Sequence, residues 1–325
     1  MSTTISEADA LYQRVAHVIP RVEWATMVDD VQAILRLKAE KNAVILAHNY
    51  MTPEIYHGVA DIVGDSLALA REATKVDADV IVLAGVHFMA ETAKLLNPSK
   101  TVLIPDLRSG CSLAESVTPE DVRALRAAHP GVPVVTYVNT SAAVKAESDI
   151  CCTSGNAVKI IESLGVDEVI MIPDQFLAAN IGAQTGVKMI VHPGACEVHE
   201  RFTPDDIETI REGNPGVTVI AHPECPRPVV LASDFSGSTA QMQDFIEKER
   251  PRKVALITEC SMSDNIAQNH PEIDFIRPCN MCPHMKRNTL AAIRHSLETL
   301  TNVVELDPAT AAPARQAIER MLAVK

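Results

Sequence analysis

The segment "NAVILAHNY", residues 42–50, decides the fold of this chain. It is a short run rich in β-branched residues, apolar at consecutive positions, that ends in a polar cluster. A run that is apolar on both faces is typical of a strand buried in a parallel sheet. Eight more such runs follow, with amphipathic stretches between them, which favours repeated βαβ units and an α/β fold. The eight are ADVIVLAG (78–85), KTVLIPD (100–106), VPVVTYVN (132–139), DEVIMIPD (167–174), VKMIVHPG (187–194), VTVIAHPE (217–224), KVALITE (253–259) and IDFIRPC (273–279).

The nine predicted strands form three groups of three. The first strand of each group ends in a polar cluster, and the third leads to a cysteine. These cysteines are 85 and 86 residues apart: Cys111, Cys196 and Cys282. The polar clusters are His48-Asn49-Tyr50, Tyr137-Val138-Asn139 and His222-Pro223-Glu224.

A fixed internal period indicates a repeat architecture. We therefore predict three homologous three-layer αβα domains, with short parallel sheets, around a pseudo-threefold axis. The predicted boundaries are an N-terminal helical segment 1–40, repeats 41–115, 116–200 and 201–286, and a C-terminal helical segment 287–325.

A small-residue turn before a helix occurs once in each group. The turns contain Gly64-Asp65-Ser66, Thr153-Ser154-Gly155 and Gly237-Ser238-Thr239. Capping hydroxyls, free backbone N–H groups and the helix dipole bind anions at such helix starts. The turns are thus candidate binding sites for anionic groups, and ordinary helix caps are the alternative.

Charge and hydropathy limit the partners of the chain. Its 325 residues carry a formal net charge of −13, with no basic stripe, which argues against a nucleic-acid partner. It has neither a long uncharged apolar span nor a secretory leader, so we expect no membrane partner and a cytoplasmic location. In that compartment we expect the eight cysteines to serve metal binding or catalysis rather than disulfides.

Three equivalent cysteines predict a shared metal centre. Functional groups of open α/β sheets gather beyond the carboxyl ends of the strands. Three repeats around one axis would bring Cys111, Cys196 and Cys282 together there. Three thiolates with one open position fit a 4Fe–4S cluster, whose open iron acts as a Lewis acid in the loss of water.

Three other interpretations of the cysteines stay open. The three could be buried structural residues, Cys279 and Cys282 could bind zinc with His284, or the same two could form a redox dithiol. The period favours Cys282, because Cys279 has no counterpart in the other repeats. Cys279 is expected either to lie behind the site or to pair oxidatively with a neighbouring thiol when the cluster is lost. Cys151, Cys152, Cys225 and Cys260 are interpreted as buried thiols rather than ligands.

Motifs that appear in one order from about residue 40 to 290 resemble the quinolinate synthase family. They are HNYMTPEI, DIVGDSLALAREA, GVHFMAETAKLLNP, CSLAES, TYVNTSAAVKAESDICCTSGNA, HPG, HPEC, SGST and CPHMK. The resemblance implies condensation of iminosuccinate (iminoaspartate) with dihydroxyacetone phosphate to give quinolinate, phosphate and water, for NAD biosynthesis. It also implies a 4Fe–4S cluster on three cysteines within three α/β domains, and contact with an L-aspartate oxidising enzyme that supplies iminosuccinate.

Site residues follow from the resemblance one position at a time. Cys111, Cys196 and Cys282 match the cluster ligands. The implied substrate contacts are His48, Tyr50, Ser66, Tyr137, Val138, Asn139, Ser154, His222, Pro223, Glu224, Ser238 and Thr239. The chain departs from the family pattern in AQM after SGST and in TECSMSDN around Glu259 and Cys260, to which we assign no role.

Glu224 is the candidate general acid or base of this chemistry, because burial beside His222 is expected to bring its pKa toward neutrality. His48 and Tyr50 are expected to orient a carboxylate or pass a proton, and Tyr137 and Asn139 to fix the imine. His87, His192, His199 and His284 are assigned to exposed loops or to positions behind the site. Two rival functions remain: a 4Fe–4S hydro-lyase acting on a hydroxy acid, and a non-enzymatic iron–sulfur sensor.

Overall fold

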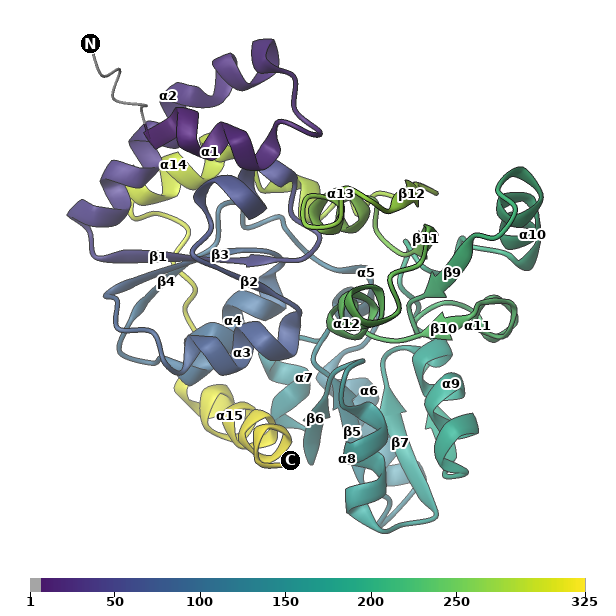
Figure 1. Cartoon of the computed structure of the whole chain (residues 1–325). Helices are drawn as coiled ribbons and strands as arrows, with labels where there is room; N and C mark the ends of the chain where they lie inside the picture. Colours follow the sequence, from purple (N-terminus) through teal and green to yellow (C-terminus); the bar gives the residue numbers. More distant parts are fainter. Residues whose placement is uncertain (1–6, 325) are drawn as a thin grey trace, which may run out of the picture.

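The computed structural model describes residues 7–324 and contains three four-stranded, all-parallel sheets (Figure 1). Their orders are β2-β1-β3-β4, β6-β5-β7-β8 and β10-β9-β11-β12, so the first two strands along the chain exchange places in every sheet. This confirms the predicted α/β fold of three αβα units. The strands are β1 (Ala43–His48), β2 (Ile62–Gly64), β3 (Val80–Ala84), β4 (Thr101–Leu103), β5 (Val134–Tyr137), β6 (Ile150–Cys152), β7 (Glu168–Ile172), β8 (Lys188–Val191), β9 (Thr218–Ala221), β10 (Phe235–Ser236), β11 (Lys253–Ile257) and β12 (Asp274–Ile276).

Each sheet holds one strand more than the sequence predicted. The additional strands are β2, β6 and β10, which are three, three and two residues long. They are too short to show a hydrophobic period, and each lies just before its small-residue turn. The nine predicted runs correspond to the other nine described strands.

Helices cover the sheets and the two ends of the chain. They are α1 (Glu7–Val15), α2 (Arg21–Glu40), α3 (Ser66–Ala73), α4 (His87–Leu96), α5 (Ser112–Glu115), α6 (Pro119–Ala128), α7 (Ala142–Ala146), α8 (Ala157–Leu164), α9 (Gln175–Thr185), α10 (Pro204–Gly213), α11 (Arg227–Ala232), α12 (Thr239–Glu249), α13 (Ser261–Ala267), α14 (Leu290–Thr299) and α15 (Pro308–Ala323), with a π-helical turn η1 (Glu54–Val59) and a 3-10 turn η2 (Met285–Arg287). Within residues 7–324, no helix is long and apolar enough to cross a membrane.

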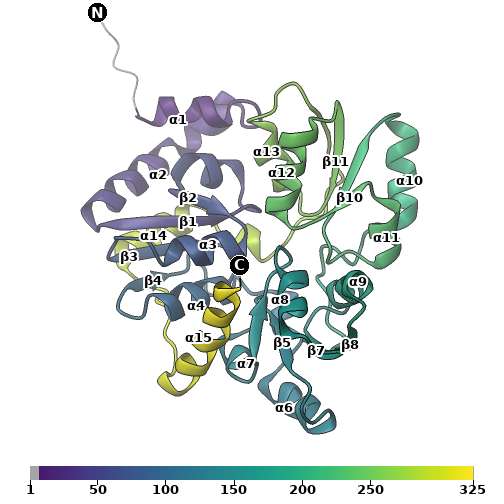
Figure 2. The same cartoon turned by 60° about the horizontal axis from the view of Figure 1, so that its bottom comes forward.

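The three units are arranged as lobes around a common centre (Figure 2). Helices near the chain ends pack on the units: α15 contacts α4 of the first unit and α7 of the second and so joins these two, and α2 packs against α14. One large apolar core runs through the first two sheets and reaches the third, with Trp24 and all of β3 buried in it.

A helix with an equivalent cap begins eight residues after each of the three cysteines. Thr118, Thr203 and Thr289 lie seven residues after Cys111, Cys196 and Cys282, and each side chain accepts a hydrogen bond at the start of α6, α10 or α14. In α6 and α10 the cap is a full capping box with Pro in the first turn, a strong signal for a helix start. The period therefore extends past the cysteines, and the chain leaves each cysteine loop in a fixed direction.

Candidate active site

A single cavity is lined by residues of all three units, where the first strand of each sheet ends. Twelve of the predicted site residues line it: His48, Tyr50, Ser66, Cys111, Tyr137, Asn139, Ser154, Cys196, His222, Glu224, Thr239 and Cys282. The other three, Val138, Pro223 and Ser238, do not line it. Residues that the sequence analysis did not select also contribute to the wall, among them Asp65, Ser112, Thr153, Glu197, His199 and His284. Most of these lie within three positions of a predicted site residue, so closeness in sequence is the signal that could have found them.

The three thiols occupy equivalent turns. Cys111, Cys196 and Cys282 are free, and each sulfur receives hydrogen bonds from the backbone N–H groups two and three residues later. Burial raises the pKa of all three, that of Cys111 to about 12, and the backbone hydrogen bonds oppose the rise. Each of these thiols keeps its proton unless a cation compensates the thiolates.

This donor set fits a 4Fe–4S cluster. Its sulfurs share one cavity, and N–H groups directed at cluster sulfurs are a recognised means of stabilising thiolate ligation. The other free cysteines, Cys151, Cys152 and Cys225, are fully buried and do not line the cavity. A further group, Cys196, His199 and Glu224, has ligand atoms within 4.8 Å of one another and is also capable of holding a metal ion.

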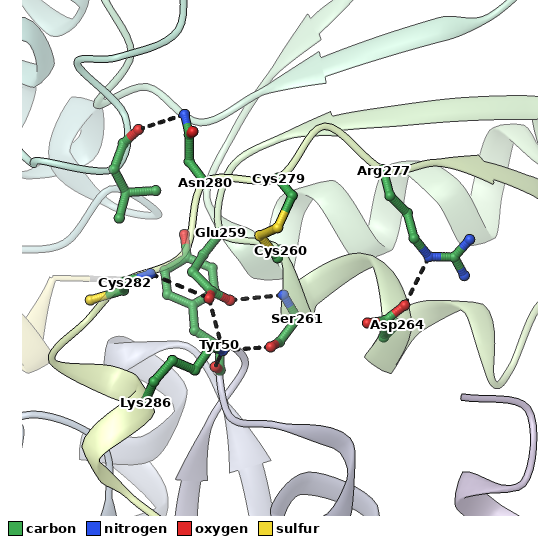
Figure 3. Close-up of a disulfide and its surroundings, with 11 residues drawn as sticks. Tyr50, Glu259, Cys260, Ser261, Asp264, Arg277, Cys279, Asn280, Cys282 and Lys286 are labelled. Carbon is green, nitrogen blue, oxygen red and sulfur yellow. Dashed lines mark hydrogen bonds and ion pairs between the residues drawn. A yellow bond between two sulfur atoms is a disulfide. The ribbon is translucent and has the colours of Figure 1, made fainter. Parts of the chain in front are cut away.

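Cys279 forms a disulfide with Cys260, with their Cα atoms 4.8 Å apart (Figure 3). The expectation that the cysteines serve metal binding or catalysis rather than disulfides does not hold for this pair, whereas oxidative pairing of Cys279 with a neighbour was one of its two expected roles. The bond also removes Cys279 from a zinc site with Cys282 and His284 and from a dithiol with Cys282. The fold brings the start of α13 against the loop before Cys282, a proximity that the 19-residue separation in sequence does not indicate.

Glu259, to which no role was assigned, lies beside this disulfide and is fully buried. Its Oε1 pairs with Lys286 Nζ at 2.8 Å, and its Oε2 accepts from Ser261 N at 2.9 Å. Lys286 Nζ also donates to the carbonyl of Tyr50 at 3.0 Å (Figure 3). The Cys282 turn is thereby joined to the strand end that carries Tyr50.

A buried chain of polar groups runs from Tyr137 to Tyr50. The Tyr137 hydroxyl donates to Glu224 Oε1, and His199 Nδ1 lies 2.8 Å from Glu224 Oε2. His199 Nε2 is 2.9 Å from Thr258 Oγ1, which is 2.7 Å from the Tyr50 hydroxyl. His199, which was expected in an exposed loop or behind the site, is 1% exposed, lines the cavity and is the central residue of this chain of polar groups.

The surroundings of Glu224 keep it ionised. Burial alone would raise its pKa, but His222, His199 and the Tyr137 hydroxyl outweigh burial and lower the pKa below its usual range. The predicted shift toward neutrality was therefore wrong. Burial and the charge of Glu224 together raise the pKa values of Tyr50 and Tyr137 well above 10.

His48 and His222 have the same local geometry. The Nδ1 of His48 accepts from Tyr50 N at 3.2 Å, and the Nδ1 of His222 accepts from Glu224 N at 3.3 Å. Burial lowers the pKa of His48 to about 4 and that of His222 to about 3. Both rings are neutral at pH 7, and the Nδ1 contact assigns the ring proton to Nε2.

The three small-residue turns meet at the cavity, with two departures from the predicted caps. The residue at the cap of α8 is Asn156 rather than Ser154, and its side chain makes no capping hydrogen bond. The α3 cap is Asp65 rather than Ser66, and its carboxylate accepts from Ala68 N at 2.8 Å. A Cβ on Gly155 would come within 3.2 Å of Ser238 Oγ, so Gly lets the second and third turns approach. The hydroxyl of Ser238 caps α12 by accepting from Gln241 N, which leaves Thr239 as the cavity hydroxyl of this turn.

Comparison with known proteins identifies the family. The family model described as "Quinolinate synthetase A protein" matches residues 32–323. The chain belongs to the quinolinate synthase family. "Quinolinate synthase 2" of Mesorhizobium japonicum (strain LMG 29417 / CECT 9101 / MAFF 303099) is 67% identical over 324 residues, which cover 100% of both chains. "Quinolinate synthase" of Agrobacterium fabrum (strain C58 / ATCC 33970) is 66% identical over 99% of this chain and 94% of its own. "Quinolinate synthase" of Xylella fastidiosa (strain Temecula1 / ATCC 700964) is 67% identical over 91% and 87%.

The resemblance stated from the motifs is thus confirmed, and the protein is an enzyme of the quinolinate synthase family. The name of the family implies NAD biosynthesis through quinolinate.

Proposed function

We propose that the protein condenses iminosuccinate with dihydroxyacetone phosphate to form quinolinate, with a 4Fe–4S cluster held by Cys111, Cys196 and Cys282. Family membership supports quinolinate synthesis. The observation that carries the mechanism is the cavity in which three equivalent thiols and the ionised Glu224 lie together. The two substrates together contain the atoms of quinolinic acid, phosphoric acid and two water molecules, so no oxidant or reductant is needed.

Three hydroxyl-bearing turns hold the anionic substrates in this proposal. Ser66, Ser154 and Thr239 line the cavity at or just before the starts of α3, α8 and α12, where backbone N–H groups and helix dipoles favour anions. The substrates carry two carboxylates and one phosphate, one for each turn. Val138, Pro223 and Ser238 do not line the cavity, and they contribute by holding the loops whose neighbouring residues bind the substrates.

Glu224 accepts a proton from the substrate in the proposed reaction. The reaction requires imine–enamine and ketose–aldose tautomerisation, elimination of phosphate, ring closure and loss of water. The ionised carboxylate accepts a proton from carbon and, because Tyr137 and His199 stabilise its ionised form, readily passes that proton on. The neutral Nε2–H groups of His48 and His222 donate to substrate oxygens, Tyr50 passes or orients protons, and Tyr137 and Asn139 fix the imine.

When bound, the cluster supplies a Lewis-acidic open iron that favours departure of a hydroxyl group as water. We place the enzyme in the cytoplasm, with small anionic substrates and neither nucleic acid nor membrane as partners. A functional contact with an enzyme that oxidises L-aspartate follows from the need for iminosuccinate, because free imines hydrolyse in water.

An anaerobic assay tests the proposal. The cluster-containing protein is mixed with iminosuccinate and dihydroxyacetone phosphate, and pyridine dicarboxylate is followed by its absorbance. We expect quinolinate from the wild type, and loss of the brown cluster absorbance in Cys111→Ser, Cys196→Ser and Cys282→Ser. Cys151→Ala, a buried thiol away from the cavity, and Cys279→Ser are expected to keep the absorbance. Absence of product from cluster-replete protein would contradict the proposal.

A further inference from the structure

Two asparagine side chains form the same unusual contact in different parts of the molecule. Asn265 Nδ2, on α13, donates to the carbonyls of Asn49 at 3.0 Å and Met51 at 2.8 Å. Asn180 Nδ2, on α9, donates to the carbonyls of Pro223 at 2.9 Å and Cys225 at 3.0 Å. Each amide therefore binds the carbonyls on both sides of one cavity residue, which is Tyr50 in the first case and Glu224 in the second.

The two asparagines are equivalent by the period of the chain. They are 85 residues apart, and each lies six residues after the acid that follows the second predicted strand of its repeat, Asp174 or Glu259. They are 1% and 3% exposed, and neither Oδ1 has a hydrogen-bond partner in the described chain. Both amides therefore act solely as donors, and the contacts they donate to are the two carbonyls.

The third strand end is held by a different donor. Lys145, which is fully buried, donates from Nζ to the carbonyls of Val138, at 2.8 Å, and of Thr140. These carbonyls flank Asn139, the counterpart of Tyr50 and Glu224. Glu91 on α4 of the first unit accepts from Ala142 N at 2.9 Å, so this loop too has a contact from a neighbouring unit.

We infer that Asn180 and Asn265 are positioning residues that set Glu224 and Tyr50 in the cavity, each acting from one unit on the strand-end loop of the next. The two peptide planes around a residue determine where its side chain points, and a donor shared by both carbonyls fixes those planes together. The contacts run in one direction around the molecule: the second unit holds the third, and the third holds the first. The inference rests on the proposed function for its activity test, but not for its structural test.

Amide hydrogen exchange of the cluster-containing protein provides the structural test. Asn180→Ala is expected to speed exchange about tenfold in residues 221–226 and to leave residues 47–52 unchanged, because each lost hydrogen bond weakens local protection. Asn265→Ala is expected to do the reverse. Asn97→Ala is the matched control, since it removes a buried amide–carbonyl bond to Ala93 away from the cavity and should change neither segment. Acceleration of both segments in both variants, or of neither, would overturn the inference.

Activity separates positioning from general destabilisation. Asn180→Ala should lower kcat in the wild type and in Tyr50→Phe, but not further in Glu224→Gln, where the group it positions is already altered. Asn265→Ala should lower kcat in the wild type and in Glu224→Gln, but not further in Tyr50→Phe. Equal losses in both backgrounds would contradict the assigned targets. If the wild type makes no quinolinate, the proposed function fails, while the exchange result still decides the positioning.

Discussion

The strand ends that carry Tyr50 and Glu224 have the same set of backbone contacts, here called the shared frame, and differ in their chemistry. In both, a histidine Nδ1 accepts from the backbone N–H two residues later, and an asparagine from another unit binds the flanking carbonyls. One frame presents a phenol whose pKa is raised by burial, and the other presents an ionised carboxylate. The repeat thus supplies the geometry, whereas single positions within it supply the reactive groups.

Glu224→Gln tests the carboxylate side of this comparison and should have the largest effect. The amide keeps the size of the side chain but loses its charge and its basicity. We expect kcat to fall about 10²–10⁴-fold, the range for a general base. Single-turnover kinetics on the cluster-containing enzyme measure it, with Glu212→Gln on the exposed face of α10 as control. A fall below tenfold would remove Glu224 from the role of base.

His48→Gln tests the shared frame through pH. Because burial lowers the pKa of folded His48 to about 4, the unfolded chain binds a proton between pH 6.5 and 4 that the folded protein does not. Stability from this group is therefore complete above pH 6.5 and is lost as the pH falls toward 4, by up to about 3 kcal/mol. Gln does not titrate and can still accept from Tyr50 N.

The measurement is urea unfolding of the cluster-free protein between pH 7 and pH 4. The variant should lose about 3 kcal/mol less than the wild type over this interval. His222→Gln should behave similarly, with a window that reaches lower because the pKa of His222 is about 3. Parallel pH curves for wild type and variant would show that the two histidines are not held neutral.

Tyr50→Phe tests the phenol side and should be milder than Glu224→Gln. It removes the 2.7 Å hydrogen bond to Thr258 while His199 keeps its own contact with that hydroxyl. We expect kcat to fall about tenfold, in keeping with the loss of one buried hydrogen bond. Steady-state kinetics with Tyr56→Phe as control measure it. An effect as large as that of Glu224→Gln would mean that the phenol itself carries the essential proton.

The smallest effect is expected for the helix caps outside the cavity. Thr118→Ala and Thr203→Ala each remove an equivalent helix cap and should each cost about 1 kcal/mol of unfolding free energy. The costs should add, since the caps share no partner. Urea unfolding measures them, with the exposed Thr299→Ala as control. Markedly unequal costs would show that the repeats have diverged in stability as well as in chemistry.

Much of this molecule could be predicted from its sequence, because the period of the chain appears in its apolar runs and its cysteines. The α/β class, nine strands and the cysteines Cys111, Cys196 and Cys282 at one cavity follow from that period. The strands β2, β6 and β10 were missed because two or three residues carry no hydrophobic period.

Contacts between distant segments account for the remaining differences. The pairing of Cys260 with Cys279 depends on how α13 meets the Cys282 loop. His199 gains its place because the fold brings it against Glu224 and Thr258. Asn180 and Asn265 bind backbone carbonyls of another unit, a contact that no local sequence pattern predicts.

The asparagine contacts run in one direction around the molecule, as contacts between the subunits of a ring do. A unit that holds its neighbour's strand end, and has its own held by the other neighbour, behaves like a subunit of a ring. Three copies of one chain of about 85 residues would satisfy such contacts by closing with threefold symmetry. The site then resembles the centre of a small oligomer whose subunits were joined end to end. The reactive residue of one unit can be substituted while the contacts of the other two units preserve the ring.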